Sequence, residues 1–235
     1  MMGGDDRQAY DRNSNIFSPD GRLYQVEYAR EAVKQGSPSV GIATGEGVVL
    51  AATRRIRSPL VESSSIEKLH KVDHNHAVAS AGHVADARQL VDVARRASQV
   101  ERLRYDEPIT TEQLTTEVAE HIQQYTQSGG TRPFGAALLI AGYVEDPSTK
   151  GGGDPRLFET DPSGTAIEWH ASAIGAGSDD IESTLEERYD ESMGLEDAIG
   201  LARDVLEEQT DEDTDDEISV AAVTKDGYQT RTPEE

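Results

Sequence analysis

The sequence predicts an α+β fold in which antiparallel sheets are covered by layers of helices. The expected elements run as strands, two helices, strands, two helices and a final strand. Grouped strands and grouped helices favour separate layers over an alternating parallel sheet. With 235 residues the chain is long enough for one sizeable core, so we expect a single domain over residues 1–235.

The first expected element is a helix over residues 20–34, preceded by a turn. Ser18-Pro19-Asp20-Gly21 has turn chemistry, because proline presets φ while Asp and Gly supply a side-chain bond and a permissive backbone. Apolar residues at 23, 26 and 33 then recur on one side at near-helical spacing. Residues 1–12 are polar and contain glycine, so we expect them to form a mobile tail.

Two strand pairs and two helices should follow. Residues 40–43 and 48–53 are joined at Gly45-Glu46-Gly47, a hairpin signal, and residues 66–72 and 77–81 flank a polar turn. Apolar positions at 87, 90, 91, 94, 97 and 100 predict a helix over 86–103. Thr110 and Gln113 form a capping box for the next helix, which we expect to stop at Gly129-Gly130.

The second half repeats the pattern. Strands are expected near 136–143, 156–159, 166–170 and 173–174, helices from Ser178 and from Gly194 or Leu195, and a late strand over 218–224. The glycine-rich stretch 147–155 predicts an exposed loop. Residues 36–235 should therefore form the layered body of the domain.

The net charge is extreme, at −23 from 45 acidic and 22 basic residues. The acidic residues are spread along the chain, with one dense run at 207–217. This spread favours adaptation to a cytoplasm of high salt, where charges are screened, over a localised acidic surface for a partner. Nucleic acid is excluded as a partner class, because phosphate binding needs a basic stripe that the sequence lacks.

Other composition features narrow the function class. Cysteine is absent, so there is no disulfide framework and no thiolate site. No apolar run reaches transmembrane length, and no charged-then-apolar signal peptide opens the chain. We expect a cytoplasmic protein that does not contact a membrane.

One long segment and four shorter ones carry a resemblance to a known family. FSPDGRLYQVEYA followed by EAV, within residues 10–33, closely resembles the N-terminal signature of proteasome α-type subunits. The resemblance continues in SSSIEKL at 63–69, GHVADARQLVDVAR at 82–95, QQYTQSGGTRPFG at 123–135 and PRLFETDPSG at 155–164. It implies a four-layer αββα sandwich of the N-terminal-nucleophile hydrolase type.

The resemblance also implies an assembly and its partners. Such a chain would be one subunit of a heptameric outer ring, built from neighbouring α subunits by repeated heterologous contacts and stacked on rings of β subunits. A regulatory AAA ATPase and unfolded protein substrates are the other implied partners. No cofactor is expected.

Peptidase activity is not expected of this chain. Catalytic members of the resembled family use a threonine freed as the first residue, with its own amine as base and a lysine and an aspartate to tune it. Here Ser37 stands at that place, but it follows Gly36 and therefore has a peptide nitrogen and no base. Aligning the catalytic pattern puts Thr53 where the aspartate belongs and Ser64 near the lysine. We expect all three roles to be vacant.

The resemblance instead points to a gate at the N-terminus. Tyr10, Asp11, Pro19 and Tyr28 match a cluster that orders the N-terminal tails when the axial gate opens. Tyrosine hydroxyls with an aspartate, and a proline against aromatic rings, provide a small lock with two arrangements. The simpler alternative is that Tyr24 and Tyr28 merely pack the helix.

A docking pocket and a pore loop are implied as well. The family places the lysine at Lys68 between adjacent subunits, where it meets the C-terminal carboxylate of the ATPase, and Gly82 would line the same pocket. His83 stands where an apolar residue is more usual. Ser128 to Gly135, including Gly129, Gly130 and Arg132, would form the constriction through which only unfolded chains pass. The simpler alternatives are a solvent-facing lysine and an ordinary helix–strand connection.

Three other constellations have structural explanations. The histidines at 70, 74, 76 and 83 are close in sequence, but a strand pair would divide them between two faces and a turn, so no metal site is expected. Residues 211–222 start like a calcium loop but have Asp216 and Ala222 at its glycine and glutamate positions. Gly175-Ala176-Gly177 is better explained by helix capping than by nucleotide binding.

Two competing hypotheses remain open. One is an active N-terminal-nucleophile hydrolase that exposes Ser37 after cleavage, which would remove residues 1–36. The other is a stand-alone acidic binding domain with the same fold but no ring. Intact mass tests the first, and the gate motif argues against the second because a tail lock has no purpose in a monomer.

Overall fold

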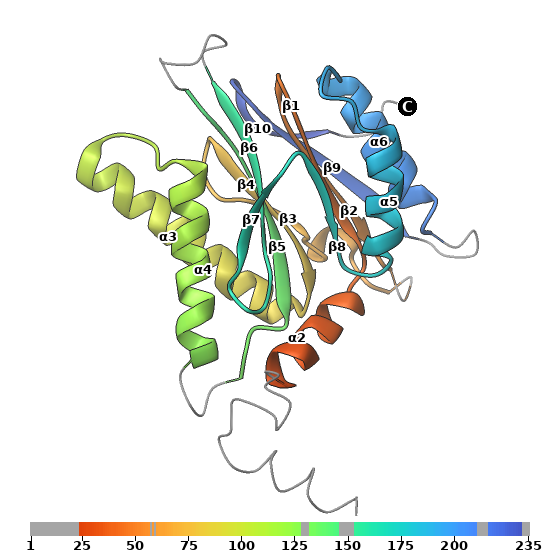
Figure 1. Ribbon diagram of the computed structural model, residues 1–235, viewed down its shortest axis with the longest axis horizontal. Coiled ribbons are helices and arrows are strands. Elements are labelled where there is room, and N and C mark those ends of the chain that lie inside the picture. Colours follow the sequence, from red (N-terminus) through yellow and green to blue (C-terminus); the bar gives the residue numbers. More distant parts are fainter. Residues whose placement is uncertain are drawn as a thin grey trace, which may run out of the picture.

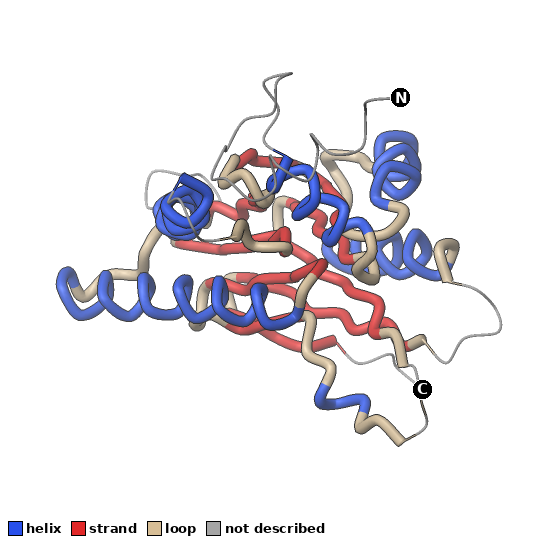
Figure 2. The backbone as a smooth tube through the Cα atoms, turned by 90° about the horizontal axis from the view of Figure 1, so that it is seen from below, coloured by secondary structure: helices blue, strands red, loops and turns tan. Residues whose placement is uncertain are grey.

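The structure, a computed structural model, describes residues 24–56, 58, 60–127, 132–145, 153–210 and 216–231. Within these residues, two five-stranded sheets stack face to face between two layers of helices, as Figures 1 and 2 show from two directions. Every strand pair is antiparallel. The predicted α+β sandwich is therefore confirmed.

The first sheet has the order β10-β9-β2-β1-β8 and the second β3-β4-β5-β6-β7. The strands of the first sheet are β1 (Ser39–Thr44), β2 (Gly47–Arg54), β8 (Ala171–Ile174), β9 (Glu217–Thr224) and β10 (Gly227–Arg231). Those of the second are β3 (Leu69–Lys71), β4 (His76–Gly82), β5 (Ala136–Val144), β6 (Asp154–Thr160) and β7 (Ala166–Trp169). β10 and β3 are thus edge strands, one in each sheet.

Helices cover the outer face of each sheet (Figure 1). α3 (Val84–Tyr105) and α4 (Thr111–Gln127) pack on the second sheet, whereas α5 (Ser178–Arg188) and α6 (Leu195–Glu207) pack on the first. α2 (Tyr24–Lys34) contacts β4 and β5 at one end of the sandwich, and a short 3₁₀ turn, η1 (Ser63–Ser65), precedes β3. Among these helices none is long and apolar enough to span a membrane.

The core has three apolar layers because the central strands are buried on both faces. Along β2, Leu50 faces the space between the sheets while Val49 faces α6. Along β5, Leu139 packs between the sheets and Ile140 packs against α3 and α4. This alternation explains why these strands appear in the sequence as nearly continuous apolar runs.

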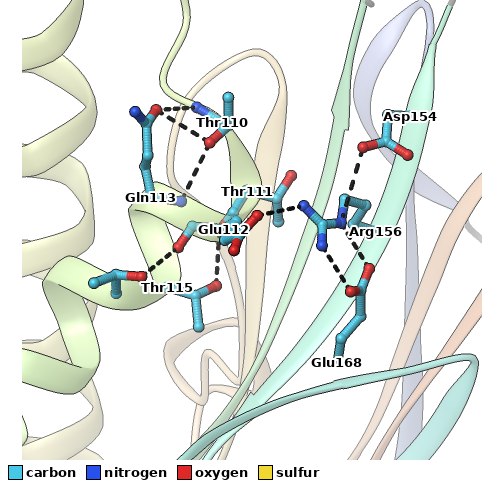
Figure 3. Close-up of polar contacts among 9 residues, drawn as sticks. Thr110, Thr111, Glu112, Gln113, Thr115, Asp154, Arg156 and Glu168 are labelled. Atoms are coloured by element: carbon cyan, nitrogen blue, oxygen red, sulfur yellow. Dashed lines mark hydrogen bonds and ion pairs between the residues drawn. The ribbon is translucent and has the colours of Figure 1, made fainter. Parts of the chain in front are cut away.

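Most predicted boundaries agree with the structure, including the hairpin that pairs Thr44 with Gly47. The capping box of α4 is also confirmed, since the Thr110 hydroxyl accepts from the Gln113 N–H at 3.2 Å and the Gln113 side chain accepts from the Thr110 N–H at 3.2 Å (Figure 3). Beside it, Arg156 on β6 donates to Glu112 at 3.0 Å and to Glu168 at 2.6 Å. Arg156 therefore connects the start of α4 to the edge strand β7.

One expectation was wrong, and one strand was missed. The strand predicted over 66–72 is shortened to Leu69–Lys71, because Ile66 donates its N–H to the Ser63 carbonyl at 3.1 Å and so stays in the preceding turn. β10 was not predicted, since GYQTR has no apolar alternation. It forms because the β9 edge supplies hydrogen-bonding partners from Val220 to Thr224. Residues 1–23, which include the whole expected tail over 1–12 and the turn at 18–21, lie outside the described residues.

Candidate functional site

Lys68 and Ser37 are the central pair of the candidate site. Ser37 follows the end of α2, and Lys68 immediately precedes β3. The Lys68 ammonium donates one hydrogen bond to the Ser37 hydroxyl at 2.9 Å and another, short one to the Ser37 carbonyl. The lysine side chain is buried, which contradicts the simple alternative of a solvent-facing lysine.

Three glycines bring the backbone segments of this site into contact. A Cβ placed on Gly36 would lie 2.3 Å from the amide nitrogen of Gly82, and one placed on Gly82 would lie 2.3 Å from the carbonyl oxygen of Gly135. Gly82 also has a φ of +101°, which side chains rarely adopt. Gly82 therefore lies in close backbone contact with Gly36 and Gly135, which joins the end of α2 to the ends of β4 and β5.

The surroundings of Lys68 disfavour a charged amine. Burial, followed by repulsion from Arg55, lowers the pKa of Lys68 from 10.5 to about 7. The backbone of Lys68 is held in place as well, because its carbonyl accepts from the Ser80 N–H at 3.1 Å. The amine of Lys68 is thus held in place, and a negatively charged group that approaches it would favour its protonated form.

The structure corrects the assignment of the catalytic pattern. Ser64 was expected near the lysine position, but it is Lys68 that brings an amine to Ser37. Thr53 lies beside the pair, since its N–H donates to the Pro38 carbonyl at 3.0 Å, and its buried hydroxyl has no partner. The expectation that no lysine stands beside Ser37 is therefore wrong. Ser37 still has a peptide nitrogen, and Thr53 supplies no carboxylate.

Gly82 and His83, the other residues expected at a docking pocket, lie at the same end of the sandwich. His83 is exposed, its N–H donates to the Gly135 carbonyl at 2.8 Å, and its ring lies against Gly135. Gly82 and His83 do not line the pocket that Lys68 lines within this chain. Lys68 and Gly82 are connected through the backbone, because Lys68 contacts Ser37 and the preceding Gly36 contacts Gly82.

Only Tyr28 of the gate cluster falls within the described residues. Its side chain is 65% exposed, while Val26, Ala29 and Val33 form the buried face of α2. Tyr24 is also exposed, so these tyrosines do not pack the helix onto the body. Tyr10, Asp11 and Pro19 lie outside the described residues.

Arg132 has a defined position that the sequence did not predict. Its guanidinium donates two hydrogen bonds to Asp86 in the first turn of α3, at 2.6 and 2.7 Å, and the same carboxylate accepts from the Gly135 N–H at 2.8 Å. The hydrogen bond from Arg132 is the main cause that lowers the pKa of Asp86. Asp86 therefore holds the exit of the 128–135 loop, whose Gly129 and Gly130 lie outside the described residues.

The four nearby histidines have separate environments. His76 is fully buried with Nδ1 3.0 Å from Asp73, whereas His70 lies 3.6 Å from Glu67. The rings of His74 and His83 lie against Gly227 and Gly135. Among the described residues no three metal-binding side chains gather. Asp211, Asp213 and Asp215 lie outside the described residues.

The capping explanation of Gly175-Ala176-Gly177 is confirmed, because Gly177 is the N-cap residue of α5. Gly177 has a φ of +69°, and its carbonyl accepts from the Ile181 N–H at 3.0 Å, which forms the first turn of the helix.

The buried network of Asp73, His76 and Ser98 was missed by sequence reasoning. An Asp–x–x–His spacing at the turn of a predicted strand pair was the available signal.

Comparison with known proteins agrees with this geometry. Residues 33–223 match the family model described as proteasome subunit, and residues 10–32 match the model described as the N-terminal signature of the A-type proteasome subunit. The chain is 65% identical over 201 residues to the proteasome alpha 2 subunit of Haloarcula marismortui, covering 86% of this chain and 80% of that protein. It is 59% identical over 227 residues to the proteasome alpha subunit of Natronomonas pharaonis, covering 96% and 86%.

A further relative, the proteasome alpha subunit of Halobacterium salinarum, is 62% identical over 208 residues, covering 88% of this chain and 79% of the relative. These relatives come from halophilic archaea, which agrees with the interpretation of the acidic composition as adaptation to high salt. The family models together cover most of the chain, and they include the signature that carries the α-type resemblance. The chain therefore belongs to the proteasome subunit family, and within it to the α type.

Proposed function

We propose that this chain is a non-catalytic α-ring subunit of a cytoplasmic proteasome core particle. In this role it joins neighbouring α subunits in a heptameric ring, supports the β-rings, controls substrate access through its N-terminal tail and docks the C-termini of a regulatory AAA ATPase. The observation that carries the proposal is the match of residues 10–32 to the α-type signature directly before a sandwich-forming domain.

The gate assignment is supported by the exposure of Tyr28. Within the described part of the chain Tyr28 is 65% exposed, so its ring is accessible to residues of the tail or of a neighbouring subunit. In the proposal, Tyr10, Asp11 and Pro19 complete this cluster when the gate is open. Tyr10→Ala and Asp11→Ala should therefore lower ATPase-stimulated opening, and variants that gate normally would contradict the assignment.

The docking assignment is supported by the position of Lys68. Its amine lies beside the Gly36–Gly82 contact at an end of the sandwich. Burial lowers the pKa of Lys68 to about 7, and a carboxylate that approaches the amine would stabilise its charged form. A carboxylate bound to a cation and backbone donors is a known mode of terminal-peptide recognition. Unfolded substrates would then pass the 128–135 loop, whose exit Asp86 holds.

The absence of a free nucleophile supports the non-catalytic role. Ser37 is joined by a peptide bond to Gly36, and α2 precedes both residues in the chain. The Gly36 carbonyl accepts from the Ala176 N–H at 2.8 Å. The contact between Lys68 and Ser37 is the one observation that favours the alternative of a serine-type N-terminal nucleophile. Intact mass of the assembled protein separates the two: loss of residues 1–36 would overturn the non-catalytic proposal.

The ring itself is tested by expressing the chain in high salt and imaging it by negative-stain electron microscopy. Heptameric rings with an axial opening are the expected result. Monomers in high salt that form rings only when a second α-type chain is added would indicate a mixed ring. Monomers in the presence of α and β partners would contradict the ring and favour the stand-alone acidic domain.

A further inference from the structure

A side-chain contact joins α2 to the turn between β6 and β7. Arg30, in the middle of α2, donates two hydrogen bonds to the Oδ2 atom of Asp161, from Nε at 3.1 Å and from a terminal nitrogen at 2.7 Å. Asp161 lies in the turn, 131 residues further along the chain. Glu27, one turn earlier in α2, is a more distant partner of the same guanidinium at 3.9 Å. The contact with Asp161 therefore connects the N-terminal helix to a hairpin of the second sheet.

The turn that carries Asp161 is itself held in place. The Oδ1 atom of Asp161 accepts from the Ser163 N–H at 3.0 Å, so one carboxylate oxygen shapes the turn and the other binds Arg30. Gly164 packs closely on α4, where Gln123 donates to its carbonyl at 2.9 Å. A Cβ placed on Gly164 would lie 2.5 Å from the Gln123 side chain, and its φ is +79°. Arg30 thus binds an acceptor that α4 keeps in a fixed position.

The apolar contact between α2 and the body of the domain is narrow. Val26, Ala29 and Val33 are the buried residues of this helix. By helical periodicity Arg30 flanks this stripe, whereas Tyr28 lies on the far side and is 65% exposed. A rotation of α2 about its own axis would therefore displace Tyr28. Because so narrow a stripe resists rotation weakly, the contact of Arg30 at its flank is in a position to oppose it.

The charges of α2 make the Asp161 contact the stronger of its two ion pairs with the body. Burial by itself would raise the pKa of Asp161, but hydrogen bonds, led by those from Ser163 and Arg30, outweigh it and lower the pKa below 3.8. Asp161 is thus an ionised acceptor, and hydrogen bonds to ionised groups are the stronger kind. Lys34 and Asp179 form the other pair, but their charged atoms are 4.0 Å apart and both side chains are largely exposed.

We propose that Asp161 is a positioning residue for the gate: through Arg30 it holds α2 in the rotation that presents Tyr28 to the other gate residues. The inference rests on the proposed gating function and adds to it a residue outside the gate cluster. Without the contact α2 adopts further orientations, and the fraction of subunits whose Tyr28 is productively placed falls. A carboxylate in the second sheet then influences a gate that it does not touch.

Peptide hydrolysis by the assembled particle tests the proposal. Arg30→Gln removes the cation and leaves the turn intact. Asp161→Asn keeps an oxygen that can accept from the Ser163 N–H, but it replaces the acceptor of Arg30 with an amide NH₂. A partly exposed ion pair changes an equilibrium constant by about two- to fivefold, so ATPase-stimulated hydrolysis should fall by about that factor in both variants. Lys34→Gln, the matched control on the same helix, should leave the stimulation unchanged.

Deletion of residues 2–12 separates positioning of the gate from general damage to the particle. A particle without tails needs no gate opening, so Arg30→Gln should not alter its hydrolysis rate. An equal loss in the tail-deleted particle would overturn the proposal. The double variant of Arg30→Gln and Asp161→Asn should be no weaker than the weaker single variant, because both changes remove the same contact. Additive losses would show that the two residues act separately and would also overturn it.

The outcomes distinguish this proposal from the gating function on which it rests. If Tyr10→Ala or Asp11→Ala lowers the stimulation while Arg30→Gln and Asp161→Asn do not, the gate stands and the positioning role of Asp161 is overturned. If the ATPase does not stimulate the wild-type particle, both are overturned. Should Asp161→Asn fail to assemble, Arg30→Gln alone decides, since it leaves the turn untouched.

Discussion

The Lys68 amine of this chain is hydrogen-bonded to Ser37, with 2.9 Å between Nζ and the serine Oγ. The contact joins the segment that leaves α2 to the segment that enters β3, and it places a buried amine beside the glycines that close one end of the sandwich. Any carboxylate that docks at Lys68 must share or replace these bonds. Substitution of Lys68 therefore tests whether this residue binds a carboxylate.

Lys68→Ala should reduce ATPase-stimulated peptide hydrolysis by at least about tenfold, because removing the cation of a desolvated ion pair typically costs about 2 kcal/mol or more. Hydrolysis by a particle whose gate tail is deleted should be unchanged, since it needs no docking. Lys71→Ala is the matched control, because Lys71 is exposed on β3 only three residues away. Equal stimulation of the Lys68 variant and the control would reject the docking assignment.

The lowered pKa of Lys68 gives a pH dependence with a definite sign. Between about pH 7 and 10.5 the unfolded chain binds a proton at Lys68 that the folded chain has released, so this residue makes the free energy of unfolding increase as pH rises. Denaturant unfolding in high salt at several pH values from about 7 to 9 measures the slope. Lys68→Met should flatten it, and identical slopes in the two proteins would show that the amine is not held neutral.

Asp86→Asn should destabilise the fold by about 2 kcal/mol, since a buried carboxylate loses the paired hydrogen bonds of Arg132 and weakens its bond to the Gly135 N–H. Denaturant unfolding provides the measurement. Asp92→Asn on the same helix is the control, because Asp92 is exposed and has one long ion pair at 3.5 Å. A loss no larger than that of the control would mean that Asp86 does not hold the loop exit.

Gly82→Ala should cost about 2 kcal/mol or more, because the residue has a φ of +101° and its Cβ would meet the Gly135 carbonyl oxygen at 2.3 Å. Gly200→Ala in α6 is the opposite case. A Cβ at Gly200 has open space, so this change should stabilise the helix by about 1 kcal/mol. Thermal unfolding of both variants compares them, and a neutral Gly82→Ala would contradict the close packing of this backbone.

Asp73→Asn should lower the free energy of unfolding at neutral pH and make it depend less on pH in acid, because the ionised Asp73 carboxylate stabilises the fold. Burial raises the pKa of Asp73, but hydrogen bonds from His76, Ser98 and the Asn75 N–H outweigh it and bring the value to about 2, compared with 3.8 when unfolded. The stabilisation, about 2 kcal/mol, is present above pH 3.8 and is lost as pH falls toward 2. Unfolding followed through this range should be less steep in the variant, and an unchanged acid transition would contradict the network.

Much of the fold could be predicted because it depends on local patterns. Periodicity identified the central strands and the four helices after the first strands, since each buries one or two continuous apolar faces. Local chemistry identified the Thr110–Gln113 cap and the helix start at Gly177. β10 was missed because its polar residues make a strand only where β9 supplies a partner. The pattern of apolar residues within β10 contains no information about this partner.

For the candidate site, too, some residues could be identified from the sequence, whereas their contacts depend on the tertiary structure. The α-type signature, Gly82 and Lys68 could be identified from the sequence, because the resemblance to the family rests on residue types at fixed spacings. The partners of these and other residues were decided by the tertiary structure: Ser37 for Lys68, Asp86 for Arg132, and Glu217 for Arg54. Each of these partners lies tens of residues or more away from the residue it contacts. Only the stacking of the two sheets and the packing of the helices at their ends bring such side chains within hydrogen-bonding distance.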